Sequence, residues 1–306
     1  MKKKFDCVAM KHAAQAIIRK EVQGMTPDEE LAYFRAGGEE FQKKILAARL
    51  RLRRSTSITR NFFLTGSTMP RTDGRRANQL RPLTITRRYT DTPAGSVLIE
   101  TGRTRVLCTV SIEEDVPRWL KESGEATVGW VSAEYGMLPG STPDRHKRGE
   151  DGRAIEIRRL IGRSLRAVVD RSKLGRRTLW VDCDVLQADG GTRTAAITGS
   201  YVALADAIDV LIARKRIETN PLTAQVAAVS VGVVDGQVLL DLDYSEDSHA
   251  EVDMNLVMTS AGEFVEVQGS AEAATFSSQQ LAGMLKLGQL GIGKLLAAQR
   301  TALSKL

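Results

Sequence analysis

A double glycine stands between an expected strand and an expected helix near the middle of the chain. Residues 188–193 read Ala-Asp-Gly-Gly-Thr-Arg. The first N–H groups of a helix lack partners within the helix and lie at the positive end of its dipole, so such a turn binds anions. Around the backbone of Gly191, the hydroxyl of Thr192 and the forked guanidinium of Arg193 suit a tetrahedral oxyanion. A plain turn is the alternative, and the sequence around this turn has no lysine of a GxxxxGKS/T triphosphate loop.

A dense group of carboxylates occupies residues 241–255, at the junction of two expected strands. Alternation along a strand puts Glu251, Asp253 and Asn255 on one face. Convergent carboxylates suit a magnesium ion or general acid-base catalysis. A solvent-facing acidic loop is the alternative, and the motif alone leaves both open.

A third motif is basic. The loop at 145–153 contains Arg145, Arg148 and Arg153, and leads into an expected helix whose Arg159 and Arg163 share a face. Such density favours contact with a nucleic-acid backbone, while a solvated face or salt bridges between subunits would give the same pattern.

The elements that must position these residues alternate between strand and helix. Hydrophobic periodicity and turn residues predict a mixed α/β domain in two halves. Hairpins are expected around Gly102, Gly236 and Gly262, and a final helix is expected to begin at a cap formed by Ser277 or Ser278. The expected strands are 97–100, 105–112, 178–186, 227–234, 237–244, 252–258 and 264–268, and the helices of this domain are 155–169 and 194–213.

The beginning of the chain has a different character. We expect a basic helical extension over 1–54, with helices at 7–22 and 27–50, then a linker at 55–68 and the main domain at 69–306. Residues 1–68 hold 14 of the 44 Lys and Arg and 7 of the 37 Asp and Glu, so they carry the whole formal net charge of +7. The charge of the chain therefore says little about the partners of the main domain.

The three cysteines, Cys7, Cys108 and Cys183, are isolated in the sequence. This spacing suits neither a disulfide framework nor a zinc site, and predicts reduced thiols and a cytoplasmic protein. The longest apolar run, 226–234, has the length of a strand, and no secretory signal follows Met1. We therefore expect no membrane partner.

Several long motifs, in the same order, closely resemble the bacterial ribonuclease PH family over residues 69–306. They are Arg71–Pro82, Gly95–Leu98, Thr104–Thr109, Ser111–Glu114, Ser132–Pro139, Ile157–Arg163, Asp182–Gly199 and Glu246–Asn255. The resemblance implies a duplicated βαβα-type ribonuclease PH fold. It also implies a reversible, phosphate-dependent 3′→5′ exoribonuclease that trims tRNA precursors and releases nucleoside diphosphates, with rRNA processing or decay as an open additional role. The expected assembly is a homohexamer, a trimer of dimers, and DNA is not an expected partner.

The family pattern also assigns residues. Arg153 and the Gly191–Arg193 turn match positions that bind inorganic phosphate, the co-substrate. Asp247 and Asp253 match acidic positions that act in catalysis or hold Mg²⁺, and either could protonate the leaving 3′ oxygen. Arg145 and Arg148 match arginines that contact tRNA, whereas Gly140 stands where an arginine is usual, which puts the affinity for tRNA in doubt.

Two other functions remain open at this stage. A catalytically silent ring subunit would be expected to lose its phosphate and acidic residues, which are all present here. A hydrolytic nuclease would release monophosphates without phosphate. The extension has its own alternatives, because Met69 lies where the family normally begins: an upstream reading frame, a start placed too early, an RNA-binding arm or a partner-binding structure.

Overall fold

The computed structural model describes residues 71, 73–147, 149, 152–271 and 275–304. The chain divides into two units at the Met69–Pro70 boundary, and the described residues belong to the second. The expected extension at 1–54, its two helices and the linker at 55–68 lie outside the described residues, as do Cys7 and Arg148.

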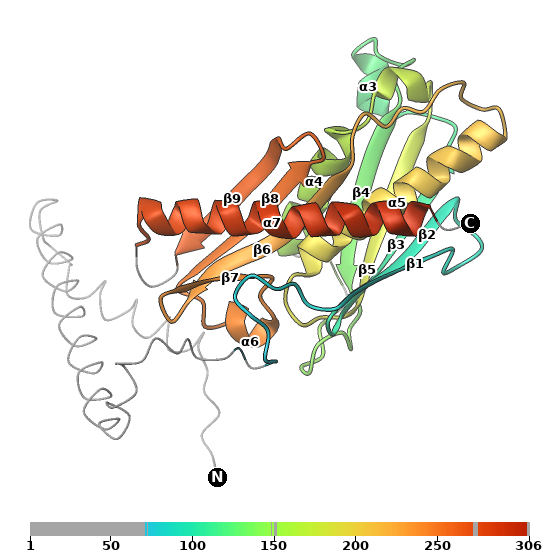
Figure 1. The fold of residues 1–306 in the computed structure, drawn as a ribbon. Coiled ribbons are helices and arrows are strands. Elements are labelled where there is room, and N and C mark those ends of the chain that lie inside the picture. The colour runs from blue at the N-terminus through green and yellow to red at the C-terminus, as the bar shows by residue number, and fades with distance from the viewer. Residues whose placement is uncertain (1–70, 72, 148, 150–151, 272–274, 305–306) are drawn as a thin grey trace, which may run out of the picture. The chain divides into compact units, whose positions relative to one another are not determined.

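The first sheet has five strands (Figure 1). Its order is β1-β2-β3-β5-β4, and every pair is antiparallel except the parallel pair β4-β5. The expected hairpin around Gly102 is confirmed, because Thr101 and Thr104 face each other across it. The strands are β1 (Leu83–Arg87), β2 (Gly95–Thr101), β3 (Thr104–Glu113), β4 (Trp130–Met137) and β5 (Thr178–Gln187).

The second sheet has four antiparallel strands in the order β7-β6-β8-β9. They are β6 (Val226–Val234), β7 (Gln237–Leu240), β8 (Val252–Thr259) and β9 (Phe264–Ala271). The turn between β6 and β7 places Asp235 and Gly236 at φ of 51° and 76°, the double positive φ of a type I′ hairpin turn. The Asp-Gly signal in the sequence therefore set this hairpin as predicted.

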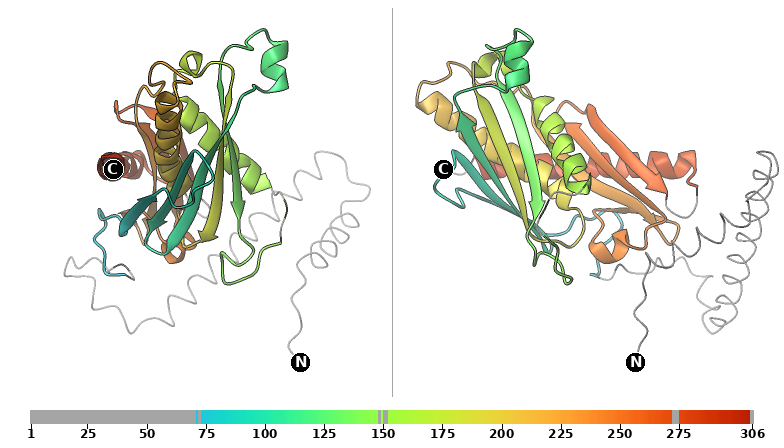
Figure 2. Two further views of the ribbon diagram at one scale, coloured as in Figure 1. Left: turned by 90° about the vertical axis from the view of Figure 1, so that its right-hand side faces the viewer. Right: turned by 180° about the vertical axis from the view of Figure 1, so that it is seen from behind.

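Three long helices build the core around the two sheets. Helix α4 (Gly152–Arg166) packs on β4, and α5 (Thr192–Ala213) contacts β2 and β3 of the first sheet and β6 of the second. Helix α7 (Ser278–Leu303) covers the opposite face of the second sheet and reaches α5 and β1 (Figures 1 and 2). Its Ser277 cap forms the expected start, with a capping box to Gln280. The mixed α/β class, with a sheet-and-helix layer in each half, is confirmed.

Length and composition alone would allow two helices, α5 and α7, to cross a membrane. Of the apolar window of α5, 83% is buried inside the protein, as in the core helix of a globular domain. The estimate that apolar runs reach only strand length was therefore wrong for α5, whose alanines and β-branched residues make it a core helix.

One expected strand ends early. The return strand after the Asp235-Gly236 turn was predicted to reach Tyr244, but β7 ends at Leu240 and Asp241 has a φ of 56°. A short helix, α6 (Tyr244–Asp247), follows, and its capping box joins Asp243 and Glu246. Strands β1 and β4, helix α3 (Arg118–Glu122) and a 3-10 turn at Arg171–Leu174 were not predicted.

Candidate functional site

The predicted glycine turn opens α5. Gly190 and Gly191 have φ of 75° and 64°, which side chains other than glycine rarely adopt, and Gly191 is the N-cap residue. The chain thus passes from β5 into α5 without a side chain over the helix start. The N–H groups of the first turn of α5 form the kind of anion site that the sequence predicted.

Two side chains fix the shape of this turn. The guanidinium of Arg81 donates to the carbonyl of Asp189 at 2.6 Å, and the hydroxyl of Thr104 donates to the carbonyl of Gly190 at 2.7 Å. The same Thr104 oxygen accepts from the N–H of Asp189 at 2.9 Å. Because its carbonyls are held from behind, the turn presents its N–H side to a ligand.

The hydroxyl of Thr192 is in contact with β4. Its Oγ1 lies 2.8 Å from the Tyr135 hydroxyl, and both residues are buried. Burial raises the pKa of Tyr135, while the Thr192 hydrogen bond and the positive charges of Arg153 and Arg193 lower it, and the net direction is upward. The electrostatic influence of both arginines shows that they lie around this hydroxyl pair.

Arg193 is oriented by two neighbours. Its guanidinium lies 3.5 Å from a carboxylate oxygen of Glu156 on α4 and donates to the side-chain oxygen of Gln268 on β9 at 3.2 Å. Gln268 in turn donates to Glu156 at 2.9 Å. Arg193 therefore stands where α4, α5 and β9 meet, with 16% of its side chain exposed.

The register of the second sheet brings Asp253 to the same area. On β8 and β9, Asn255 faces Gln268 and Asp253 faces Ser270. Alternate residues of a strand share a face, so Asp253 lies on the sheet face that carries Gln268, the partner of Arg193.

Asp247 reaches the site from another direction. It ends α6, and the backbone of Gly190 packs against the residues that begin this helix. A Cβ on Gly190 would lie 2.7 Å from the carbonyl carbon of Asp243 and 2.8 Å from the amide nitrogen of Tyr244. The structure thus joins the glycine turn to the acidic segment, two motifs more than 50 residues apart in the sequence.

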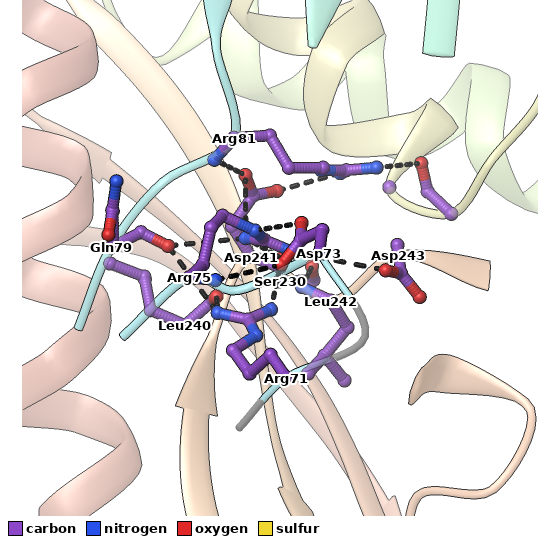
Figure 3. Close-up of polar contacts among 12 residues, drawn as sticks. Arg71, Asp73, Arg75, Gln79, Arg81, Ser230, Leu240, Asp241, Leu242 and Asp243 are labelled. Carbon is purple, nitrogen blue, oxygen red and sulfur yellow. Dashed lines mark hydrogen bonds and ion pairs between the residues drawn. The ribbon is translucent and has the colours of Figure 1, made fainter. Parts of the chain in front are cut away.

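The acidic segment is held by arginines that sequence analysis had not assigned a role (Figure 3). Arg71 forms a two-point ion pair with Glu246, with Nε 2.6 Å from Oε1, and donates to the carbonyl of Leu240 at 2.8 Å. Arg81 donates to Asp241 at 2.7 Å from both its backbone and its guanidinium. These groups are almost completely buried.

Arg75 completes this buried network. Its guanidinium donates to the carbonyl of Asp241 at 2.8 Å and lies 3.5 Å from a carboxylate oxygen of Glu246. Asp241 and Glu246 therefore belong to the framework, which corrects the reading of the whole 241–255 segment as convergent catalytic carboxylates. The only signal in the sequence was the close spacing of Arg71, Arg75 and Arg81.

Within the described residues, no group of three or more His, Cys, Asp or Glu side chains is arranged to hold a metal ion. A magnesium ion commonly takes only one or two carboxylates and completes its shell with water and substrate phosphates. Asp247 and Asp253 supply hard oxygen donors of this kind, so they fit Mg²⁺ as part of a shell that substrate would complete.

The predicted basic residues are placed differently from one another. Arg145, Arg153 and Arg159 are exposed, whereas Arg148 lies outside the described residues. Arg163 forms a two-point ion pair with Glu266 on β9, with both N–O distances at 2.8 Å. In the free chain Arg163 therefore ties α4 to the second sheet.

Comparisons with known proteins cover most of this domain. Two profiles match, described as "3′ exoribonuclease family, domain 1" over residues 79–208 and "domain 2" over residues 224–290. Ribonuclease PH of Corynebacterium glutamicum is 57% identical over 242 residues, which are 78% of this chain and 98% of that protein. Ribonuclease PH of Corynebacterium kroppenstedtii is 55% identical over 240 residues, 77% of this chain and 93% of that protein.

Solved structures share the fold at lower identity. Rice (Oryza sativa) Rrp46 matches with a TM-score of 0.63 and 22% identity, over 76% of this chain and all of that one. A chain of the Archaeoglobus fulgidus exosome, solved with RNA bound to the active site, matches with a TM-score of 0.63 and 21% identity, over 73% of this chain and 90% of that one.

Proposed function

Because this chain belongs to the 3′ exoribonuclease family that includes ribonuclease PH, we infer that it is a phosphate-dependent 3′→5′ exoribonuclease acting in tRNA processing. It is a nucleotidyltransferase in the reverse direction. The observation that carries the inference is the α5 turn, where the glycine backbone, Thr192 and Arg193 meet the segment that carries Asp247.

In the proposed reaction inorganic phosphate is the nucleophile. One of its oxygens attacks the phosphorus of the last phosphodiester, the bond to the 3′ oxygen breaks, and the terminal nucleotide leaves as a diphosphate. A dianion and a monoanion about 4 Å apart repel by roughly 8 kcal/mol at an effective dielectric constant of 20. Arg153, Arg193 and the N–H groups of Gly191 and Thr192 offset this repulsion and hold the nucleophile in place.

The departing 3′ oxygen must gain a proton. Asp247 and Asp253 are the proposed catalytic residues, one of them as the proton donor and both as carboxylates for Mg²⁺. When bound, Mg²⁺ would neutralise charge on the attacked phosphate. The two carboxylates come from α6 and β8, so they approach the phosphate turn from two elements.

RNA is the substrate, and we propose that tRNA precursors are its main form. Exposed Arg145 and Arg159, with Arg148, are proposed to contact the RNA backbone. Arg163 joins them only if RNA competes with Glu266 for its guanidinium. Gly140 is exposed and bears no side chain for RNA, so this loop contributes fewer contacts.

A homohexamer, built as a trimer of dimers, is the proposed assembly, and structural neighbours described as exosomes support an oligomer. We also propose a cytoplasmic location. Its support is chemical, because Cys108 and Cys183 are free, buried thiols, as expected for a reducing compartment.

Product analysis tests this function directly. The full chain is incubated with a tRNA that carries extra 3′ nucleotides, with and without inorganic phosphate. The proposal expects nucleoside diphosphates only when phosphate is present. Monophosphates released without phosphate would establish hydrolysis, and no release under either condition would establish a silent subunit.

A further inference from the structure

The buried contact between Tyr135 and Thr192 has no role in the function described so far. Tyr135 lies on β4, and its hydroxyl is 2.8 Å from the hydroxyl of Thr192. Thr192 is the first residue of α5, directly after the left-handed Gly191. A side chain on one sheet thus reaches the turn that is proposed to hold phosphate.

The donor in this contact follows from the ligand. A hydroxyl has one hydrogen to donate and two lone pairs that accept. A phosphate dianion can only accept from Thr192, so the Thr192 hydrogen is available to it only if the Thr192 oxygen accepts from Tyr135. The Tyr135 hydroxyl is buried and therefore has few alternative partners.

We propose that Tyr135 is a positioning residue for the phosphate nucleophile: its hydroxyl donates to Thr192 and so directs the Thr192 hydroxyl toward bound phosphate. This inference rests on the assignment of the α5 turn to inorganic phosphate. The raised pKa of Tyr135, which burial causes, agrees with a phenol that stays protonated as a donor at neutral pH.

The test is the Tyr135→Phe variant of the full chain, assayed by diphosphate release from RNA. Phenylalanine keeps the ring in the core and removes only the donor. We expect the KM for phosphate to rise about 3- to 10-fold, as for one net hydrogen bond. The kcat at saturating phosphate and the KM for RNA should stay within about twofold, because neither depends on the proposed contact.

Two further variants separate positioning from a structural role. Tyr201→Phe is the matched control, because Tyr201 is also buried but lies near Asn220 and Thr223, away from the turn. It should leave the KM for phosphate unchanged. In a Thr192→Val background, Tyr135→Phe should add no further increase, because the partner hydroxyl is already gone.

The outcomes are distinct. An unchanged KM for phosphate in Tyr135→Phe, or a fall in kcat and Tm without a change in that KM, overturns the positioning role. Additive effects of Tyr135→Phe and Thr192→Val overturn it as well. Arg193→Ala, assayed in parallel, monitors the proposed function itself: if its KM for phosphate is unchanged, the phosphate site is wrong, whereas a large rise there with no effect of Tyr135→Phe rejects only Tyr135.

Discussion

Two arginine-containing regions lie side by side in this protein and use the same side chain for different ends. In the framework network, Arg71 and Arg81 are buried and bound to carboxylates and carbonyls of the 240–246 segment. At the α5 turn, Arg153 is exposed and Arg193 keeps part of its side chain open. Burial and carboxylate partners therefore decide whether an arginine supports the fold or remains able to bind an anion.

The two regions are physically joined. Arg81 pairs with Asp241 in the network and also donates to the carbonyl of Asp189 in the turn. The network thus holds both α6 and the turn in place. If this division is right, substitutions in the network should cost stability first, and substitutions at the turn should cost activity first.

The largest effect is expected for Arg71→Ala. It removes a buried two-point ion pair and leaves the carboxylate of Glu246 with less compensation, which typically costs about 3–5 kcal/mol of unfolding free energy. Chemical denaturation measures this loss. The control is Arg105→Ala, whose pair with Glu100 is exposed and worth about 0–1 kcal/mol. Equal losses in the two variants would remove the network from the framework.

Asp253→Asn and Asp247→Asn test the other region. Each should lower kcat by about 100-fold or more, because proton donation and charge neutralisation at the leaving oxygen are weakened. The affinity for RNA, measured by filter binding or fluorescence anisotropy, should change little. An equal loss of RNA affinity and of kcat would give these carboxylates a structural role.

Gly190→Ala addresses the joint between the regions. The added Cβ would meet the backbone of Asp243 and Tyr244 at 2.7–2.8 Å, and the residue has a φ of 75°. We expect a loss of about 1–3 kcal/mol in unfolding free energy and a rise in the KM for phosphate. Gly236→Ala has the same positive φ but open space around its Cβ, and should leave that KM unchanged.

Asp182→Asn should give the smallest effect and lies outside both regions. Burial, with smaller contributions from Asp184 and Glu134, raises the pKa of Asp182. A carboxyl whose pKa is raised by folding lowers stability as the pH rises through the interval from its unfolded to its folded pKa. Asp182→Asn should therefore raise Tm slightly at pH 7, by no more than about 0.5 kcal/mol because solvent screens a half-exposed charge. This advantage should disappear below that interval, and a lower Tm at pH 7 would contradict it.

Local sequence signals predicted the parts of this fold that local physics sets. The Asp235-Gly236 turn, the Ser277 cap and the alternation of β8 each depend on a few neighbouring residues, and each was found as expected. The Gly190-Gly191 turn was found for the same reason, since positive φ favours glycine.

The missing parts depend on residues that are distant in the sequence. Arg71 binds Glu246 across 175 positions, and no periodicity connects them. The Gln268 contact of Arg193 depends on how β9 is placed against α4 and α5, which composition does not encode. The early end of β7 follows from the positive φ of Asp241, whose carboxylate is held by Arg81. These contacts required the three-dimensional structure.

The most direct test of the account is the KM for inorganic phosphate of Arg193→Ala, measured by nucleoside diphosphate release at saturating RNA. The account predicts a rise of about 100-fold or more, because a charged donor to the nucleophile is lost. The Tm should stay close to that of the unaltered chain, since Arg193 is partly open and weakly paired. An unchanged KM for phosphate would contradict the assignment of the α5 turn.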